Sequence, residues 1–215
     1  AIVEDFNYFH KDENVCLMSP LGEERSVTRK SVMPSLLQAV NYNQSRSNKD
    51  VNIFEISNTY SKDCEVCTLG IACSGTYLVN KWQKISKEAD FYLVKGFVEA
   101  IFKKLGIEES RYILQRVESD HPYLHPGRSG YLYINKQLVG YIGQVHPTMA
   151  KKYDIADTFV AELNLNVIAE LKTKKLKYEA VPQYPSVSRD IALVVDVKEE
   201  AYAMIRTIKR ASKRL

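Results

Sequence analysis

The sequence lacks any apolar run close to the roughly 18 to 20 residues that a helix needs to cross a bilayer. Its N-terminus, AIVEDFNYFHKDENV, also lacks the basic-then-apolar order of a secretory signal. We therefore expect a soluble, cytoplasmic protein with no membrane partner. Internal repeats and low-complexity segments are absent as well, and a hydrophobic content of 45% over 215 residues can supply a sizeable core. These features argue against disorder of the whole chain.

Cysteine is scarce, and of the four cysteines only Cys64 and Cys67 have the spacing of a zinc half-site. A closed structural zinc site needs a second such pair, and no Cys/His pair of matching spacing follows in the sequence. We therefore expect no metal site. We interpret the thiols of Cys16, Cys64, Cys67 and Cys73 as buried or shielded from solvent.

The net charge is a modest +4, but lysine and arginine crowd the last quarter of the chain. Two interpretations of this basic segment stay open. It can contact an RNA backbone, since phosphates are met mainly by Lys and Arg, or it can be the solvated face of a helix. Arg189, beside Asp190, can likewise contact RNA or form a salt bridge within the fold. The candidate RNA contacts are Arg189, Lys209, Arg210 and Lys213, and we expect no DNA partner.

Strand and helix patterns alternate along most of the chain. Apolar residues recur at helical spacing over residues 32–40 and 91–105, which predicts two helices. Pro34 suits the first turn of the first helix. Asp90 can cap the second helix, and Gly106 can end it. Asn135-Lys136 is a plausible hairpin turn. The strands that we predict cover residues 15–17, 51–60, 65–77, 112–117, 131–134, 137–145 and 158–165. Together these elements predict an α+β fold, a mostly antiparallel sheet with helices on it.

A second unit follows the basic run KTKKLK, which marks a linker. We place one domain at residues 1–175 and the start of another at 176–215. Residues 191–195 predict an apolar strand, and the apolar residues Ala201, Met204, Ile205, Ile208 and Leu215 predict a helix. One strand and one helix cannot bury a core alone, so we expect the sequence to stop within a domain. The first residue is not Met, which fits a chain that begins inside a longer gene product.

Five blocks of the sequence, in the same order, resemble the β subunit of bacterial phenylalanine–tRNA ligase. Residues 25–37 (RSVTRKSVMPSLL) are similar to the family's LRxSLLPGLL block, and residues 53–56 (IFEI) to its LFEIG strand. Residues 90–96 (DFYLVKG) resemble the DFxxxKG helix. Residues 125–147, which hold HPGRS and GYIGQVHP, resemble HPGRSA…GxxGxIGxxHP. Residues 185–192 (PSVSRDIA) resemble FPxVxRDIA, so the resemblance covers nearly the whole chain.

The resemblance implies a class II synthetase-like core that is not itself catalytic, followed by the start of a ferredoxin-fold anticodon-binding domain. In the family this core packs with a catalytic α subunit, and two αβ pairs form the enzyme. The holoenzyme uses ATP and magnesium to attach phenylalanine to tRNA(Phe). The resemblance therefore implies the α subunit and tRNA(Phe) as partners and no cofactor in this chain. The chain departs from the family pattern at Ser57-Asn58, where GR is usual, and at Lys30, where Thr is common.

Two arginines that the resemblance implies for catalytic class II members are missing from this chain. Such cations are needed because the ATP phosphates concentrate negative charge. One arginine follows the strand equivalent to residues 54–60, where this chain has Ser61 and Lys62. The other belongs to a glycine-rich strand and helix that match residues 158–166, which hold neither glycine nor arginine. We therefore predict no catalytic residue and no formation of aminoacyl-adenylate.

The stretch 125–147 holds the most enzyme-like side chains. His125, Arg128 and His146 can be interpreted as an acid/base pair beside an anion site, since histidine titrates near neutrality and arginine binds carboxylate or phosphate. A nucleophile or metal partner at motif spacing is missing. The neighbouring glycines and prolines favour a structural role in tight turns where two strands approach closely, with a vestigial ligand pocket as the alternative. The signature residues that we interpret as structural are His125, Pro126, Gly127, Arg128, Gly143, His146 and Pro147.

Two other functions compete with a non-catalytic ligase module. An independent RNA-binding or regulatory protein could be built on a synthetase-like core, although an incomplete final domain argues against it. A free-standing hydrolase that uses His125 or His146 would need a partner group that the sequence does not offer.

Overall fold

The computed structural model describes residues 6, 8–9, 14–23, 26–62, 64–117, 122–171, 183, 185, 187–197 and 199–211. Contacts within the chain divide it into two units, Ala1–Leu176 and Lys177–Leu215. The first unit holds a layered sheet with helices, and the second holds one helix among its described residues.

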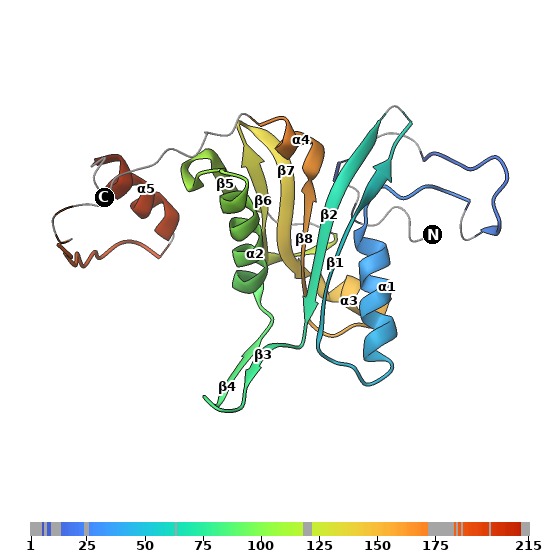
Figure 1. Ribbon diagram of the computed structural model, residues 1–215, viewed down its shortest axis with the longest axis horizontal. Coiled ribbons are helices and arrows are strands. Elements are labelled where there is room, and N and C mark those ends of the chain that lie inside the picture. The colour runs from blue at the N-terminus through green and yellow to red at the C-terminus, as the bar shows by residue number, and fades with distance from the viewer. Residues whose placement is uncertain are drawn as a thin grey trace. The chain divides into compact units, whose positions relative to one another are not determined.

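A six-stranded sheet forms the centre of the first unit, in the order β1-β2-β8-β7-β6-β5 (Figure 1). Every neighbouring pair is antiparallel. The antiparallel α+β fold that the sequence predicts is thereby confirmed. The strands are β1 (Val51–Tyr60), β2 (Glu65–Ser74), β5 (Tyr112–Arg116), β6 (Leu124–Ile134), β7 (Gln137–Val145) and β8 (Thr158–Asn164).

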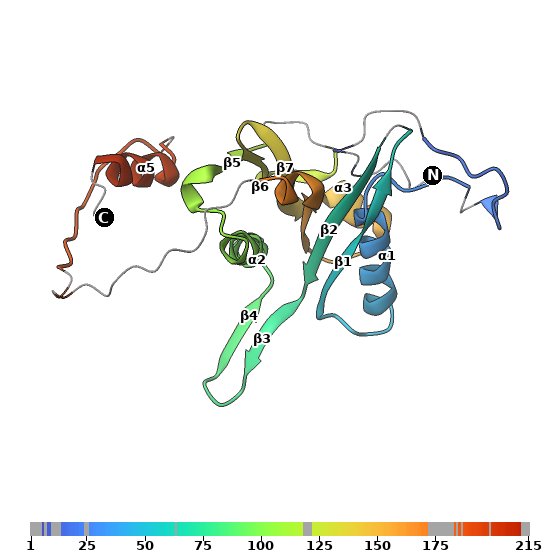
Figure 2. The ribbon, with the colours of Figure 1, turned by 45° about the horizontal axis from the view of Figure 1, so that its top comes forward.

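Two long helices cover opposite faces of this sheet, α1 (Met33–Gln44) and α2 (Phe91–Lys104) (Figure 2). The central strand β8 shows why both faces of the sheet are buried from water. Its residues alternate, so that Ala161 and Leu163 enter the core under α2 while Val160 enters the core under α1. A strand buried on both faces must be mostly apolar, and among the buried residues of β8 only Thr158 and Glu162 are polar.

Both helices begin where local sequence chemistry predicts, and α2 also ends there, whereas α1 continues to Gln44, beyond the predicted pattern at 32–40. Pro34 lies in the first turn of α1, where its missing N–H costs no hydrogen bond. The Asp90 carboxylate accepts the Leu93 N–H at 2.7 Å and so caps α2. Gly106, just beyond α2, has a φ of 72°, which a glycine adopts without strain. One residue of the predicted apolar face of α2 is not buried, since Leu105 is 45% exposed.

A small hairpin of β3 (Thr76–Asn80) and β4 (Ile85–Glu88) projects from one end of the sheet (Figures 1 and 2). The predicted strand 65–77 therefore splits in two at Gly75, which has a φ of 75°. Three short helical segments complete the unit: α3 (Pro147–Tyr153), α4 (Leu165–Ala169) and a single 3-10 turn (Glu109–Arg111).

The hairpin of β6 and β7 turns at Asn135-Lys136 as predicted, and both residues have positive φ values, 51° and 66°. The prediction of β6 over residues 131–134 was too short, because the strand already begins at Leu124. Its first part is irregular, with a register shift between Leu124 and Ser129. Proline and glycine in HPGRS weaken a strand signal, which explains the error.

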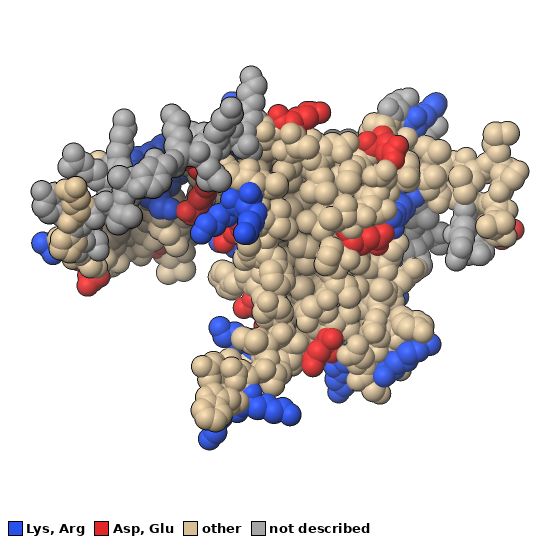
Figure 3. Space-filling view, in the orientation of Figure 1, with Lys and Arg blue, Asp and Glu red and all other residues tan. Residues whose placement is uncertain are grey.

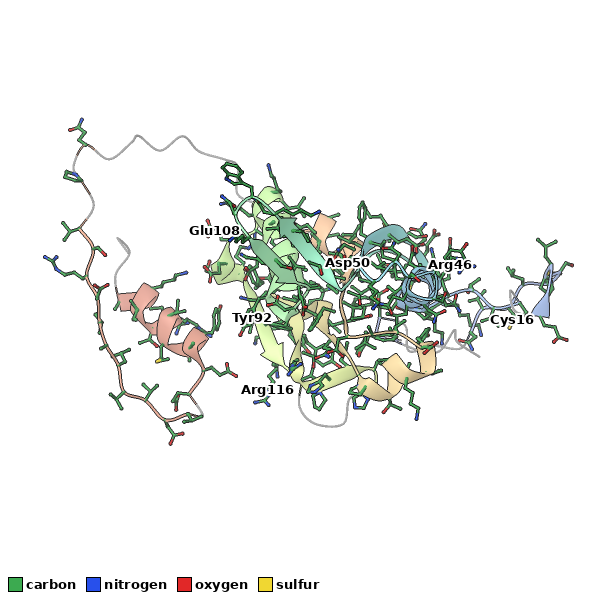
Figure 4. The ribbon with its side chains drawn as sticks, turned by 90° about the horizontal axis from the view of Figure 1, so that it is seen from below. Cys16, Arg46, Asp50, Tyr92, Glu108 and Arg116 are labelled. Carbon is green, nitrogen blue, oxygen red and sulfur yellow. The ribbon has the colours of Figure 1, made fainter. Side chains whose placement is uncertain are left out.

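The N-terminal part of the first unit is less regular than predicted. The strand expected at 15–17 is reduced to one bridge between Cys16 and Val27. The expectation of shielded thiols is wrong for two cysteines, since Cys16 and Cys64 are exposed, whereas Cys67 is half-buried and Cys73 is buried. Figure 4 shows Cys16 on a segment that extends away from the sheet, and its thiol is exposed there.

The second unit contains the predicted helix, α5 (Ala201–Ala211), whereas Leu215 lies outside the described residues. The strand expected at residues 191–195 is wrong, because residues 187–197 form no strand and Ile191 is 71% exposed. A strand needs a hydrogen-bonded neighbour, and the described part of this unit offers none. Among the described helices, none has the length and apolar content required to cross a membrane.

Candidate functional site

An open cleft of about 610 Å³ lies on the α2 face of the sheet, between α2 and the edge pair of strands β1 and β2. Its floor comes from β1 and β2, one wall comes from α2, and Leu165 at the start of α4 closes one end. The residues that line this cleft are Asn52, Ile53, Phe54, Ile56, Leu69, Ile71, Cys73, Phe97, Ala100, Ile101 and Leu165.

The register of β1 and β2 explains why the cleft is apolar. Phe54 lies opposite Ile71 and Ile56 opposite Leu69, and residues directly opposite in an antiparallel pair share one face of the sheet. None of the lining residues carries a charge. Burial also raises the pKa of the Cys73 thiol to about 11, so this sulfur is not an anion near neutral pH. The cleft therefore offers neither cations for phosphates nor carboxylates for a metal ion.

The side chains in the two stretches where the resemblance implies catalytic arginines hold the fold together instead, and Leu165 of the second stretch lines the cleft. Ser61, just after β1, donates its N–H to the Cys64 carbonyl at 2.9 Å and closes the β1–β2 turn. At the other stretch, Asn164 caps α4 by accepting the Val167 N–H. Asn166 accepts the Cys67 N–H at 3.2 Å and donates to the Glu65 carbonyl, which ties α4 to β2. In this second stretch, the side-chain amides of Asn164 and Asn166 hold the backbone in place. The stretch contains no arginine.

The opposite face of the sheet holds a buried polar cluster around Glu162, which is fully buried on β8. Its carboxyl group accepts hydrogen bonds from Ser31 Oγ (2.8 Å), the Val32 N–H (2.9 Å) and the Tyr141 hydroxyl (2.7 Å). Ser31 Oγ in turn accepts the Met33 N–H at 3.0 Å. Glu162 therefore satisfies the Val32 N–H at the start of α1 from across the core, while Ser31 satisfies the Met33 N–H locally.

Sequence reasoning missed this cluster, although one signal was present. Glu162 is the single charged residue in TFVAELN, at a position where the strand alternation points it toward the α1 face. A carboxyl group in an otherwise apolar central strand requires hydrogen-bond partners.

Burial raises the pKa of Glu162 to about 7, although the hydrogen bonds from Tyr141, Val32 and Ser31 act in the opposite direction. The folded chain then holds this proton to a higher pH than the unfolded chain, whose Glu titrates near 4.5. Protonation of Glu162 therefore contributes fully to the free energy of unfolding below pH 4.5, and this contribution is lost as the pH rises through 7. We expect a loss of roughly 2.5 kcal/mol in the free energy of unfolding between pH 5 and pH 8.

Urea unfolding of the wild type and of Glu162→Gln at several pH values measures this effect. The Gln side chain does not titrate, so the variant should lack this part of the pH dependence. Parallel curves for the two proteins would contradict a raised pKa at Glu162.

Arg29 gives Ser57, one of the residues where this chain departs from its family pattern, a side-chain partner. The guanidinium group forms an ion pair with Glu55 at 2.7 Å and also donates to the Ser57 hydroxyl and to the Asn58 carbonyl. Ser57 thus belongs to a polar contact with Arg29 and Glu55, whereas the Asn58 side chain donates to Glu65. Lys30, the other departure, is buried.

The structure gives each histidine of the 125–147 stretch a backbone partner. His125 Nδ1 accepts the Gly127 N–H at 3.1 Å, and His146 Nδ1 accepts the Thr148 N–H at 3.2 Å. His146 is the N-cap of α3, and Pro147 begins that helix. These are local contacts of the kind that hold turns and helix ends.

Arg128 and Gly143, the other two signature residues with specific contacts, lie where β6 and β7 approach each other. Arg128 donates to the Gln144 side chain at 2.9 Å and lines a small pocket of about 380 Å³ next to Asp90 and Tyr92, near the labelled Tyr92 in Figure 4. A Cβ atom at Gly143 would lie only 2.6 Å from the Cβ of Ser129, so glycine is needed where β6 and β7 approach each other. The structure does not bring His125, Arg128 and His146 into a shared hydrogen-bond network among the contacts of the described residues.

The candidate RNA contacts lie in the second unit. Lys209 and Arg210 lie in the last turn of α5 and are exposed, and Arg189 is exposed with its guanidinium donating to the Ser188 carbonyl. Lys213 lies outside the described residues. Across the described residues, no three His, Cys, Asp or Glu side chains are grouped so that they could hold a metal ion.

Comparison with protein families and with known proteins identifies one group of relatives. The family model described as "Phenylalanyl tRNA synthetase beta chain CLM domain" matches residues 3–165. The phenylalanine–tRNA ligase β subunit of Bacillus subtilis is 38% identical over 211 residues, which is 95% of this chain and 26% of the relative. The Bacillus licheniformis protein of the same name is 39% identical over 94% of this chain and 25% of its own length.

Solved structures show the same fold in more distant proteins. Two structures of pyrrolysyl-tRNA synthetase from Desulfitobacterium hafniense match with TM-scores of 0.51 and 0.52. Their sequences are 17% and 19% identical to this chain; the matches cover 70% and 73% of it and 51% and 52% of the solved chains. At this identity the likeness concerns the fold alone.

Proposed function

Because the chain belongs to the family of phenylalanine–tRNA ligase β subunits, we propose that it is a non-catalytic core module which supports a catalytic α subunit and the positioning of tRNA(Phe). The chain spans about a quarter of the length of the curated relatives that it matches. The activity of the whole ligase is therefore proposed for an assembly and not for this chain by itself.

The observation that carries the proposal is the uncharged cleft beside α2. One of the two stretches where the family resemblance implies a phosphate-binding arginine, residues 158–166, contributes Leu165 to its lining, and the lining holds no charged side chain. Transfer of a nucleotidyl group requires cations held against the phosphates in the transition state. Hydrocarbon side chains such as Phe54 and Leu69 cannot replace them. The sheet is kept as a scaffold, and the chemistry is assigned to another subunit.

The partners and cofactors follow from this assignment. We assign ATP and magnesium to the α subunit, none to this chain, and a stoichiometry of two αβ pairs to the enzyme. We assign no DNA or membrane partner, and we place the ligase in the cytoplasm, where translation uses its product.

The second unit is proposed as the start of a ferredoxin-fold anticodon-binding domain. Supporting features are the match of residues 185–192 to the family block and the basic, amphipathic helix α5. Arg189, Lys209, Arg210 and Lys213 are proposed as contacts to the tRNA backbone, where each would add to the salt dependence of binding. The signature residues from His125 to Pro147 are proposed to be structural.

An independent RNA-binding or regulatory protein is not favoured, since relatives matched over more than nine tenths of this chain are named as ligase β subunits.

Co-expression with an α subunit of the family tests the proposed function. We expect the two proteins to co-purify in equal amounts and to charge tRNA(Phe) with phenylalanine only together. A chain that stays free of the α subunit, or that charges tRNA without it, would contradict the proposal. Gel filtration with tRNA(Phe) alone separates it from the independent RNA-binding alternative, which requires a stable complex without the α subunit.

A further inference from the structure

The hairpin of β3 and β4 carries the most exposed aromatic side chain among the described residues. Trp82, the single tryptophan of the chain, lies in the turn between the two strands and is 92% exposed. Figures 1 and 2 show this hairpin projecting beyond the sheet. Large aromatic side chains dominate the energetics of interfaces, so an indole that faces water on a projection indicates a binding surface.

The base of the hairpin is fastened to the rest of the first unit. The Ala89 N–H donates to the Gly75 carbonyl at 2.8 Å, which joins the two strands where they leave the core. The Tyr77 ring packs edge-on against Phe97 of α2, with ring centroids 5.5 Å apart. A two-stranded hairpin is marginal by itself, and these contacts give it a fixed support.

The tip of the hairpin is also ordered by hydrogen bonds. Asn80 accepts the Gln83 N–H at 3.1 Å, and its amide donates to the Gln83 side chain at 3.0 Å. The Lys84 N–H donates to the Lys81 carbonyl at 3.4 Å. Trp82 is therefore presented on a formed turn, and a ligand that binds it pays little to order the backbone.

The charge around the indole is positive. Lys81 and Lys84 flank Trp82 in the turn, Lys87 follows in β4, and all three lysines are exposed. Figure 3 shows basic side chains at the end of this projection, at the lower left of the view. The acidic residue of the hairpin, Glu88, lies at its base, opposite Thr76. The tip therefore combines one free aromatic face with several cations.

This combination fits an unpaired nucleotide. Proteins bind single strands by stacking bases on aromatic rings and by placing lysine or arginine along the phosphates. Bases within a duplex already stack on one another and offer no free face. The chemistry of the tip of the hairpin thus matches a single-stranded segment better than a double helix.

A protein interface and a bilayer surface fit the hairpin less well, because both need a contiguous apolar surface. Leu78 and Val79 are exposed, but successive residues of a strand point to opposite faces, so these two side chains do not form one patch. Lys87 lies opposite Leu78, and Ser86 lies opposite Val79. Lysine is also depleted from the cores of protein interfaces.

We propose that the β3–β4 hairpin binds an unpaired nucleotide of RNA, with Trp82 stacked on the base and Lys81 and Lys84 against the neighbouring phosphates. The choice of RNA over DNA rests on the proposed function, since tRNA is the nucleic acid that the ligase handles. The site belongs to the first unit, whereas the candidate RNA contacts of the sequence belong to the second. One base and a few cations give a weak contact, with a Kd of roughly 10 to 100 μM, which does not persist in gel filtration.

The fluorescence of Trp82 tests the site directly, because the 215-residue chain has no other tryptophan. We expect a single-stranded oligoadenylate of about twelve nucleotides to quench this fluorescence to saturation. The same strand annealed to oligouridylate, and inorganic polyphosphate of equal charge, should quench it much less. Absence of quenching by oligoadenylate, or equal quenching by polyphosphate, would overturn the proposal. A blue shift of the emission with vesicles of anionic phospholipid, without quenching by RNA, would assign the hairpin to a membrane surface instead.

Two double variants with the same change of net charge separate a local contact from a general attraction. Lys81→Gln with Lys84→Gln removes two cations beside Trp82, and Lys103→Gln with Lys104→Gln removes two exposed cations at the end of α2. We expect the first pair to raise the Kd for oligoadenylate, read from Trp82, by about tenfold or more, and the second by less than about twofold. Equal effects of the two pairs would contradict the site. The melting temperatures should stay close to that of the wild type, since all four lysines are exposed.

An oligodeoxyadenylate of the same length tests the choice of RNA. Binding to it more than about tenfold tighter than to oligoadenylate would assign the hairpin to DNA and overturn the proposal. These titrations use the chain without an α subunit, so their failure leaves the proposed association with that subunit intact. Failure of the two subunits to co-purify would instead refute the proposed function while leaving the nucleotide contact standing.

Discussion

Replacing Glu162 with leucine should lower the free energy of unfolding by about 4 kcal/mol, although the two side chains are similar in size. The substitution leaves Ser31 Oγ, the Val32 N–H and the Tyr141 hydroxyl without their shared acceptor. All three groups lie in a dry core under α1, where no solvent can replace the lost hydrogen bonds. Urea unfolding followed by circular dichroism at pH 6 measures the change.

Glu162→Gln is the matched control for this substitution. The amide keeps one acceptor oxygen for the Val32 N–H and presents an NH₂ group to the hydroxyls of Ser31 and Tyr141, which can accept. We expect it to lose less than about 2 kcal/mol at pH 6. If leucine proved as stable as glutamine, the cluster would not anchor α1 to the sheet.

Gly140→Ala should destabilise the fold by about 3 kcal/mol, a large effect for one methyl group. A Cβ atom at this position would lie 2.4 Å from the Glu162 carbonyl oxygen and 2.6 Å from a methyl carbon of Leu163. Gly140 pairs with Leu163 in the β7–β8 ladder, so the backbone cannot move away without breaking ladder hydrogen bonds. Thermal and urea unfolding of the variant measure the loss.

Gly96→Ala provides a control of opposite sign. Gly96 lies within α2, and a Cβ atom there meets nothing within 4 Å. Alanine should therefore stabilise the helix by about 0.5 to 1 kcal/mol. A Gly140→Ala variant as stable as Gly96→Ala would contradict the close approach of β7 and β8.

The helices and most strands of the first unit were predictable from local patterns. Helix α2 combines an apolar stripe with a cap at Asp90 and a stop at Gly106, and these signals agree with one another. Strand β1 was also found, but its sequence does not reveal that Phe54 and Ile56 face solvent. That exposure depends on where α2 packs along the sheet, which is a tertiary property.

The family blocks predicted the fold better than the role of single residues. The stretch 125–147 was recognised as a signature, yet only the structure shows that His146 caps α3 and that Gly143 leaves room for Ser129. The buried carboxyl group of Glu162, which links β8 to α1 across the core, lies outside every recognised block. Its partners are more than a hundred residues away at Ser31 and Val32, so no local pattern could assign them.

The second unit was the least predictable part. Helix α5 followed from its apolar stripe, but the apolar run 191–195 was mistaken for a formed strand. Strand propensity describes a side chain that fits a pleated and partly buried surface, and it does not supply the neighbouring strand. The ferredoxin fold of this unit therefore stays a prediction.

The central claim is that this sheet scaffold carries no adenylate chemistry, and ATP–pyrophosphate exchange with phenylalanine tests it most directly. The 215-residue chain, purified without the α subunit, should incorporate labelled pyrophosphate into ATP no faster than a blank. The same chain assembled with the α subunit should show phenylalanine-dependent exchange. Exchange above the blank that stays with the chain through purification in the absence of the α subunit would contradict the account.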